Sequence, residues 1–424
     1  MSKYKLKRSN GAALYSIEPW EPRLAPLLTY VLREMDPQAR GRRGGYKFTT
    51  QELYSASPDH ASGVFPAGLF QKVVRTLKAW GHTWTVEDYR DLQALMPVPD
   101  FTQVEALRPG QEQVLLAVAS SDGGLLVGGT GIGKSFLINQ ICRMYPQLKI
   151  VIASPRVSVV DTLADNLRKS LGPAVAGKIG GGADERGRRV TVVTAKSLLK
   201  APVAECDLLL FDEVHAVGGN KLGNELACVA RARKFGFTAT PTGRGDNAEL
   251  VIEALFGPVL VDIPYTDAVG AGLVTPIEVH KYAVRQAAPF NTEGPMYARK
   301  RHGYWRNKKR NEAIACVARG FPPDEQVLIM TETLEHAIAL HQLLPEYKVV
   351  HYGGSGGKKV LAGVATDKYK LNEKLSAWLR REFSAGRLKK VISTTVWAEG
   401  VFRRMAPRAG DGTVQMLLIA GTSP

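Results

Sequence analysis

The sequence predicts an α/β protein of two or three domains built on parallel sheets. At 424 residues the chain is too long for one ordinary domain. Short apolar runs such as residues 208–211 lack polar alternation, which is typical of strands buried on both faces of a parallel sheet. Within residues 101–265 these runs alternate with stretches of helical spacing, the order that builds such sheets.

The charge balance favours a polyanionic partner. The chain carries 56 Lys and Arg against 40 Asp and Glu, a formal net charge of +16 at pH 7. Nucleic acid is the commonest polyanion available to screen such an excess. No apolar run approaches the ~18–20 residues of a membrane span. The basic start MSKYKLKRSN is not followed by the apolar stretch of a secretory signal.

The four cysteines lack the spacing of a zinc site or a disulfide framework, since none forms CxxC. They are Cys142, Cys206, Cys228 and Cys316. We interpret them as reduced thiols of a cytoplasmic protein.

The first hundred residues combine positive charge with one helical pattern. The first fifty residues hold ten basic residues and four acids. This excess of positive charge favours binding to DNA. A polar, glycine-rich stretch at 39–63 precedes LFQKVVRTLKAWG (69–81), whose apolar residues recur at helical spacing.

A glycine-rich loop follows the apolar residues 125–127 and precedes a helix that starts near Phe136. It fits G-x-x-x-x-G-K-[ST] in the strand–loop–helix context that phosphate binding requires. Its backbone N–H groups and the helix N-terminus would cradle the phosphates of ATP. Lys134 would reach the β- and γ-phosphates, and Ser135 would hold Mg²⁺. The predicted loop residues are Gly128, Gly129, Thr130, Gly131, Ile132, Gly133, Lys134 and Ser135.

Two acids follow the strand at 208–211. A carboxylate at a strand end is often only the N-cap of the next helix. Beside a phosphate loop, however, Asp212 would hold Mg²⁺ through its water shell and Glu213 would polarise the attacking water. His215 is either a packed histidine or a hydrogen-bonded link to the next motif, FGFTATPTGR (235–244). There Thr238 and Thr240 could report loss of the γ-phosphate.

A basic run at 297–310, YARKRHGYWRNKKR, contains no acid. Arg299, Lys300 and Arg301 could neutralise phosphates while Trp305 offers a stacking face. The alternative is a solvated loop, which most charge runs are. The stretch at 265–276 is rich in Gly and small residues and is the expected hinge, which gives domains at 1–100, 101–265 and 266–424.

From about Leu107 onward the chain resembles the superfamily 2 helicases and translocases. The motifs stand in family order: LRPGQ (107–111), the phosphate loop, IASPR (152–156), VTVVTAKSLL (190–199), DEVH, TATP, VLIMTETLEHA (327–337) and VISTTVWAEGV (391–401). LRPGQ and ISTTVWAEG look most like the phage UvsW-type recombination helicases and XPB-like proteins. This resemblance favours DNA over RNA as the partner. It also favours a location in the cytoplasm of a bacterium or of a phage-infected cell.

The resemblance implies two RecA-like lobes with ATP between them, after a small α/β accessory domain. Gln111 would read the adenine edge, with Arg108 nearby, and Gly400 would close over the nucleotide. The residues expected along the backbone of the nucleic-acid strand are Pro155, Arg156, Thr194 and Thr394. Thr194 and Thr394 could instead be plain strand residues, and Gly400 a turn glycine.

Two departures from the family pattern stand near the C-terminus. Phe402 replaces an acid expected to contact the ribose. The last family motif, which supplies an arginine finger, does not follow MLLIAGTSP. We expect a truncated chain, or a substitute among Arg403, Arg404 and Arg408; a missing finger costs about 10³–10⁵ in rate.

The expected function is an ATP-dependent DNA helicase or translocase acting in recombination, repair or replication of branched DNA. Two alternatives stay open: a double-stranded DNA translocase that does not unwind, and an ATP-gated DNA clamp.

Overall fold

The computed structural model describes residues 3–9, 13–35, 46–129, 131–217, 223, 225–227, 229, 231–240, 247–274, 276–277, 279–280, 282, 300–351, 373–394, 397 and 416–419. The chain divides into two compact units, one ending at Val274 and the other beginning at Thr275. Among the described helices, none has the length and apolarity needed to cross a membrane.

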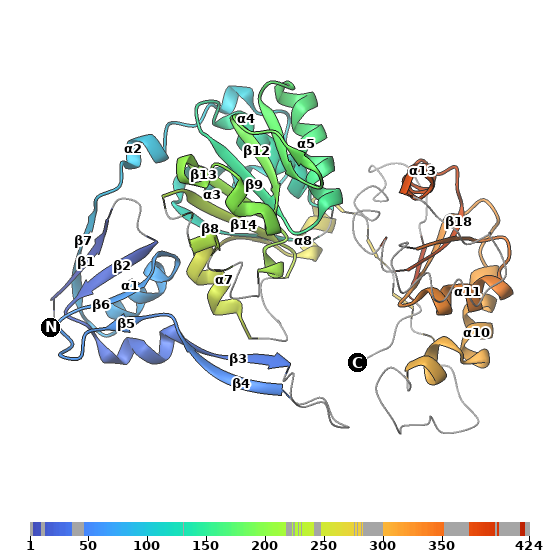
Figure 1. Ribbon diagram of the computed structural model, residues 1–424, viewed down its shortest axis with the longest axis horizontal. Helices are drawn as coiled ribbons and strands as arrows, with labels where there is room; N and C mark the ends of the chain where they lie inside the picture. The colour runs from blue at the N-terminus through green and yellow to red at the C-terminus, as the bar shows by residue number, and fades with distance from the viewer. Residues whose placement is uncertain are drawn as a thin grey trace. The chain divides into compact units, whose positions relative to one another are not determined.

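The N-terminal part of the first unit is a small α/β domain (Figure 1). Its sheet has the order β5-β6-β2-β1-β7, antiparallel except for the β1–β7 pair. Helix α1, Phe70–Ala79, occupies the segment predicted from helical spacing and adds Val73 and Leu77 to the core. The strands are β1 Lys3–Arg8, β2 Leu14–Glu18, β5 Ser55–Ala56, β6 Gly63–Pro66 and β7 Thr83–Asp88.

A separate two-stranded antiparallel ribbon leaves this domain. It consists of β3, Thr29–Met35, and β4, Tyr46–Glu52. Figure 1 shows it as an arm that extends away from the five-stranded sheet.

An eight-stranded sheet forms the centre of the first unit, in the order β11-β10-β12-β9-β13-β14-β8-β15. All its pairs are parallel except β10–β11. Its strands are β8 Gly123–Gly128, β9 Ile150–Ser154, β10 Ala176–Gly180, β11 Ala183–Asp184, β12 Val190–Thr194, β13 Leu208–Asp212, β14 Arg233–Thr238 and β15 Val259–Ile263.

Both faces of this sheet are covered, which explains why its strands are apolar throughout. One core contains side chains of α3 (Glu112–Ser120), α4 (Lys134–Met144) and α5 (Val157–Leu171). The other contains side chains of α7 (Glu249–Phe256). Helix α8, Tyr265–Gly270, adds Ala268 to the first core, so this unit continues past the boundary expected at residue 265.

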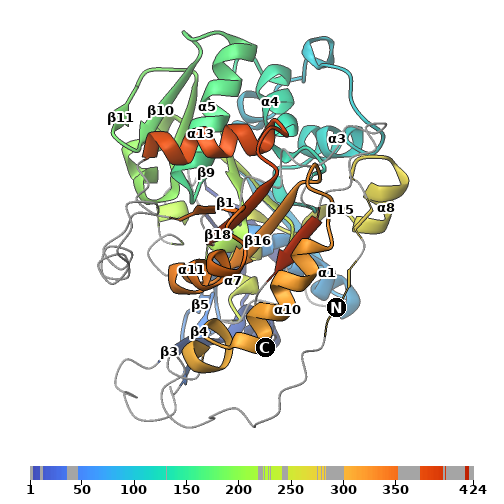
Figure 2. The ribbon, with the colours of Figure 1, turned by 90° about the vertical axis from the view of Figure 1, so that its right-hand side faces the viewer.

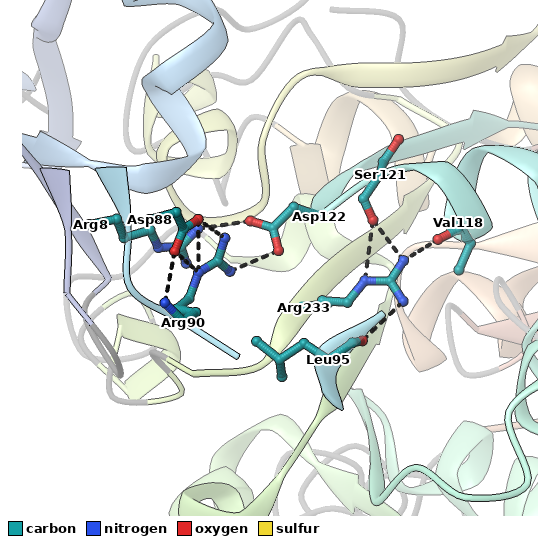
Figure 3. Close-up of polar contacts among 8 residues, drawn as sticks. All are labelled: Arg8, Asp88, Arg90, Leu95, Val118, Ser121, Asp122 and Arg233. Atoms are coloured by element: carbon teal, nitrogen blue, oxygen red, sulfur yellow. Dashed lines mark hydrogen bonds and ion pairs between the residues drawn. The ribbon is translucent and has the colours of Figure 1, made fainter. Parts of the chain in front are cut away.

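Charged side chains join the N-terminal domain to the eight-stranded sheet (Figure 3). Arg8 and Arg90 each donate to Asp122 at 2.8 Å, and Arg90 also pairs with Asp88 at 2.6 Å. Lys72 of α1 pairs with Glu253 of α7 at 2.6 Å. Ala254 of α7 packs in the N-terminal core. The domain therefore docks directly on the central sheet and its helices.

The second unit is a smaller parallel sheet in the order β17-β18-β16-β19. Helices α10 (Lys308–Arg319) and α11 (Leu334–Leu343) pack on one face, and α13 (Glu373–Ser384) on the other (Figure 2). The strands are β16 Val327–Thr331, β17 Lys348–Val350, β18 Lys390–Thr394 and β19 Met416–Ile419. The predicted fold class, α/β with parallel sheets in tandem, is confirmed.

Candidate nucleotide and nucleic-acid site

The glycine-rich loop runs from the end of β8 to the start of α4. Gly131 and Gly133 have φ of +100° and +93°, which side chains rarely adopt. A Cβ on Gly128 would overlap the end of the Ile132 side chain, which would have to shift. A Cβ on Gly129 would meet no described atom within 4 Å. The loop therefore has an open side where a phosphate could approach. Thr130 lies outside the described residues.

Lys134, the first residue of α4, is buried and points back over the loop. Its Nζ donates to the carbonyl oxygen of Gly128 at 3.2 Å. The same atom lies 3.8 Å from Oε1 of Glu213. The ammonium group thus lies between the loop and the acids of β13, although β14 separates β8 from β13 in the sheet.

Asp212 is the last residue of β13 and is fully buried, while Glu213 has left-handed backbone with φ of +59°. Such a conformation is strained for a residue other than Gly, Asn or Asp, and it aims the side chain away from the strand direction. The Glu213 side chain makes no capping hydrogen bond to the following turn, Val214–Ala216. The simple N-cap interpretation does not describe this residue. Asp212 and Ser135 offer a carboxylate and a hydroxyl, the oxygen ligands that Mg²⁺ prefers.

A short polar chain connects Glu213 to the end of β14. His215 Nδ1 lies 3.4 Å from Glu213 Oε2 and 3.4 Å from Thr238 Oγ1. Thr238 Oγ1 also accepts from the N–H of Thr240 at 3.1 Å. The two strand ends are therefore linked through one imidazole, as expected if this histidine connects the two motifs.

Gln111 is tied to the glycine-rich loop. Its Nε2 donates to the carbonyl oxygen of Ile132 at 2.8 Å, and its Oε1 accepts from the N–H of Arg108 at 3.0 Å. A Cβ on Gly133 would lie 2.7 Å from that Nε2. The side chain thus holds the loop in place, and a role in reading adenine stays a prediction for Gln111 and Arg108.

The residues expected to follow a nucleic-acid backbone in the first unit lie at one edge of the sheet. Pro155 and Arg156 follow β9, and Thr194 ends the neighbouring β12, where it pairs with Ser154. Partial burial lowers the pKa of Arg156, and the nearby charge of Glu213 works against this effect. Parallel strands thus bring these side chains together at their carboxyl ends.

The triglycine at 180–182 belongs to the same edge, and sequence reasoning missed it. All three residues have positive φ: +109°, +61° and +89°. A Cβ on Gly180 would lie 2.8 Å from Thr194 Oγ1, so a larger residue there would displace that threonine. The signal available in the sequence was the GGG run itself. Only glycine, which has no Cβ, fits so close to Thr194.

In the second unit, Thr394 is the last residue of β18 and is nearly buried. The basic run is folded onto the start of α11. Lys300 donates to Glu332 at 2.6 Å, while Arg301 and Arg306 both donate to Glu335, at 3.0 and 2.5 Å. Arg299 and Gly400 lie outside the described residues, as do Phe402 and the three arginines considered as a substitute finger.

Trp305 requires a correction. It is only 3% exposed, and its Nε1 donates to Glu332 Oε2 at 3.4 Å. A buried indole offers no face on which a base could stack. The sequence predicts an exposed indole here because local spacing does not show that Glu332 and Glu335 bind the run at the start of α11.

Residues 104–243 match the family model described as type III restriction enzyme, res subunit. No curated protein matches the chain by sequence.

Among solved structures, the UvsW helicase of bacteriophage T4 aligns with 61% of this chain and 99% of its own, at 17% identity and a TM-score of 0.45. The DUF1998 helicase MrfA, bound to DNA, aligns with 78% of this chain and 46% of its own, at 13% identity and a TM-score of 0.51. At this identity the MrfA likeness speaks for the fold. The family match covers residues 104–243, which contain the glycine-rich loop and the acids at the end of β13.

Proposed function

We propose that the chain is an ATP-dependent DNA helicase or translocase that remodels branched DNA, working in the cytoplasm. The observation that carries this proposal is the convergence of Lys134 and Glu213 beside the open side of the glycine-rich loop. A cation, a carboxylate and an open phosphate loop at one sheet edge are the parts that phosphoryl transfer to water needs.

Each residue would have a distinct task. The ammonium of Lys134 would neutralise the β- and γ-phosphates, and the carboxylate of Glu213 would accept the proton of the attacking water. Ser135 and Asp212 would hold Mg²⁺, which neutralises phosphate charge when it is bound. Gln111 and Arg108 would bind the adenine. Because Asp212 is buried, the negative charge of its carboxylate stays close to the loop and away from bulk water.

The nucleic-acid strand would cross the edge formed by Arg156, Thr194 and Gly180. Backbone atoms at a glycine can approach a phosphate closely because no side chain intervenes. The hydroxyl of Thr194 can donate to a phosphate oxygen, and Arg156 can neutralise one. In the second unit, Thr394, and more weakly Lys300 and Arg301, would also contact nucleic acid. DNA is favoured over RNA by the motifs at 107–111 and 391–401.

The link from Glu213 through His215 to Thr238 would couple hydrolysis to movement. Loss of the γ-phosphate changes what Glu213 contacts, and the imidazole would pass this change to the end of β14. Thr240 would follow through its hydrogen bond to Thr238.

A second candidate is translocation without unwinding, favoured by the match of residues 104–243 to a restriction-enzyme subunit. Three assays on the whole protein separate the possibilities. ATP turnover stimulated by DNA tests the motor, displacement of a triplex-forming strand tests movement, and displacement of a duplex strand tests unwinding. Triplex displacement alone would establish the second candidate. Turnover with neither displacement would reduce the protein to an ATP-gated clamp.

A further inference from the structure

The β3–β4 ribbon has two unlike faces. Its register places Arg33 opposite Phe48, Val31 opposite Thr50 and Glu34 opposite Lys47. Because side chains alternate along a strand, one face of the ribbon, here called the outer face, is formed by Thr29, Val31, Arg33, Met35, Tyr46, Phe48, Thr50 and Glu52. Leu32 and Lys47 belong to the other face.

Aromatic side chains lie on the exposed side of this ribbon, which hydrophobic burial alone would not produce. Phe48 and Tyr46 of the outer face are 62% and 52% exposed, whereas Leu32 of the opposite face is only 4% exposed. Exposed aromatics grouped on one strand face mark an interaction surface. In the described part of the ribbon, that surface has no apolar cover.

The outer face also carries a cation beside its aromatic rings. The guanidinium of Arg33 stacks over the Tyr46 ring at 3.8 Å from its centroid. The one acid of the outer face, Glu52, stands at the opposite end of β4 from Tyr46, and Glu34 lies with Lys47 on the other face. Ring faces beside a cation complement a polyanion with flat bases, and the chain as a whole carries a net charge of +16.

The ribbon is held in place against the central sheet. The side-chain Nδ2 of Asn247 donates to the carbonyl oxygen of Val31 at 3.3 Å, and Asn247 has left-handed backbone with φ of +59°. Asn247 precedes α7, the helix on which the N-terminal domain docks through Lys72 and Glu253.

We propose that the outer face of the β3–β4 ribbon is a stacking platform for single-stranded nucleic acid. Phe48 and Tyr46 would stack with unpaired bases, and Arg33 would neutralise a phosphate. This inference rests on the proposed function only in taking nucleic acid as the partner, since it requires no ATP chemistry. Single strands are specified because paired bases do not present their faces.

The test measures binding without nucleotide, by fluorescence anisotropy of a labelled oligothymidine and of an abasic oligomer of equal length. Phe48→Ala should weaken oligothymidine binding about tenfold, the effect of losing one stacked base. Binding of the abasic oligomer should stay unchanged, because the backbone charge of the oligomer and of the protein is the same. Phe48→Trp should restore oligothymidine binding.

Tyr89→Ala provides a matched control, because Tyr89 is 61% exposed and lies on the same domain outside the ribbon. It should bind both oligomers as the parent does. Equal binding of oligothymidine by Phe48→Ala and the parent would overturn the proposal. An equal loss of binding to both oligomers would also overturn it. A shift from dimer to monomer with unchanged binding would do the same, and it would identify the face as a contact between copies of the chain. ATP turnover of the parent protein tests the proposed function separately.

Discussion

The ammonium nitrogen of Lys134 lies 3.8 Å from a carboxylate oxygen of Glu213, although β14 separates β8 from β13, the strands that precede these two residues. An ion pair at this distance holds the lysine over the glycine-rich loop and orients the glutamate toward it. A phosphate entering the loop would compete with Glu213 for the ammonium. Nucleotide binding should therefore release the Glu213 carboxylate, which can then accept a proton from the attacking water.

Lys134→Ala should abolish ATP turnover while the fold stays intact. Removing one preorganised charge donor from a phosphoryl-transfer site lowers the rate by about 10²–10³. The measurement is steady-state phosphate release, with a thermal melt to confirm folding. Normal turnover by a folded variant would contradict the assignment of the loop. Lys149→Ala, an exposed lysine paired with Glu205, should leave turnover unchanged.

Glu213→Gln should bind ATP and DNA tightly and hydrolyse slowly. The amide keeps the shape of the side chain but cannot accept a proton, and general-base catalysis contributes about 10²–10⁴ in rate. Equilibrium nucleotide binding and single-turnover hydrolysis separate the two effects. Loss of nucleotide binding would instead make Glu213 a metal-holding or structural residue.

Thr238→Val should uncouple hydrolysis from movement. Valine keeps the branched shape but removes the hydroxyl that faces His215 and accepts from Thr240. We expect nucleotide affinity to hold and DNA stimulation of turnover to fall about tenfold, within the usual range of coupling energies. Thr191→Val is the control, because Thr191 is fully buried and its hydroxyl has no hydrogen-bond partner in the described chain. Equal stimulation in Thr238→Val and the parent would remove Thr238 from the coupling path.

Glu335→Gln should strengthen DNA binding if the basic run contacts phosphates. Burial alone would raise the pKa of Glu335, but hydrogen bonds from Arg306 and Arg301 outweigh it, so the pKa lies below its usual value and the group is charged at neutral pH. Removing that charge frees the two arginines. The slope of log K against log salt should steepen by about 0.7 per added contact on single strands. An unchanged slope would leave the run with a structural role only.

Asp122→Asn should loosen the joint between the N-terminal domain and the central sheet. Burial raises the pKa of Asp122, but Arg90 and Arg8 outweigh this and leave the pKa below 3.8. A depressed pKa gives stability that is present above the unfolded-state pKa and is lost as pH falls through the folded value. Asparagine does not titrate, so in Asp122→Asn we expect no such loss of stability from this group below about pH 4.

At neutral pH we expect Asp122→Asn to cost about 1–2 kcal/mol, since the carboxylate keeps partial access to water. Thermal melts from pH 3 to pH 7 measure both effects. Asp165→Asn, which removes an exposed pair with Arg168, should change the melting temperature little. Equal pH profiles for Asp122→Asn and the parent would show that the joint does not depend on this charge.

The sequence by itself determined the local parts of the first unit. The strand, loop and helix around Lys134 were predictable because apolar runs, glycine positions and helical spacing act over a few residues. The same holds for α1 and for Asp212 at the end of a buried strand. These features depend on the chain's own backbone preferences.

Only the tertiary structure decided what each side chain faces. Burial of Trp305 depends on Glu332, and the place of Gly180 depends on Thr194 in a neighbouring strand. Asp122 meets Arg8 across 114 residues of sequence. The exposed face of the ribbon likewise follows from its register, which pairs Arg33 with Phe48. Exposure and charge pairing arise from contacts between distant segments, and no local pattern of residues specifies those contacts.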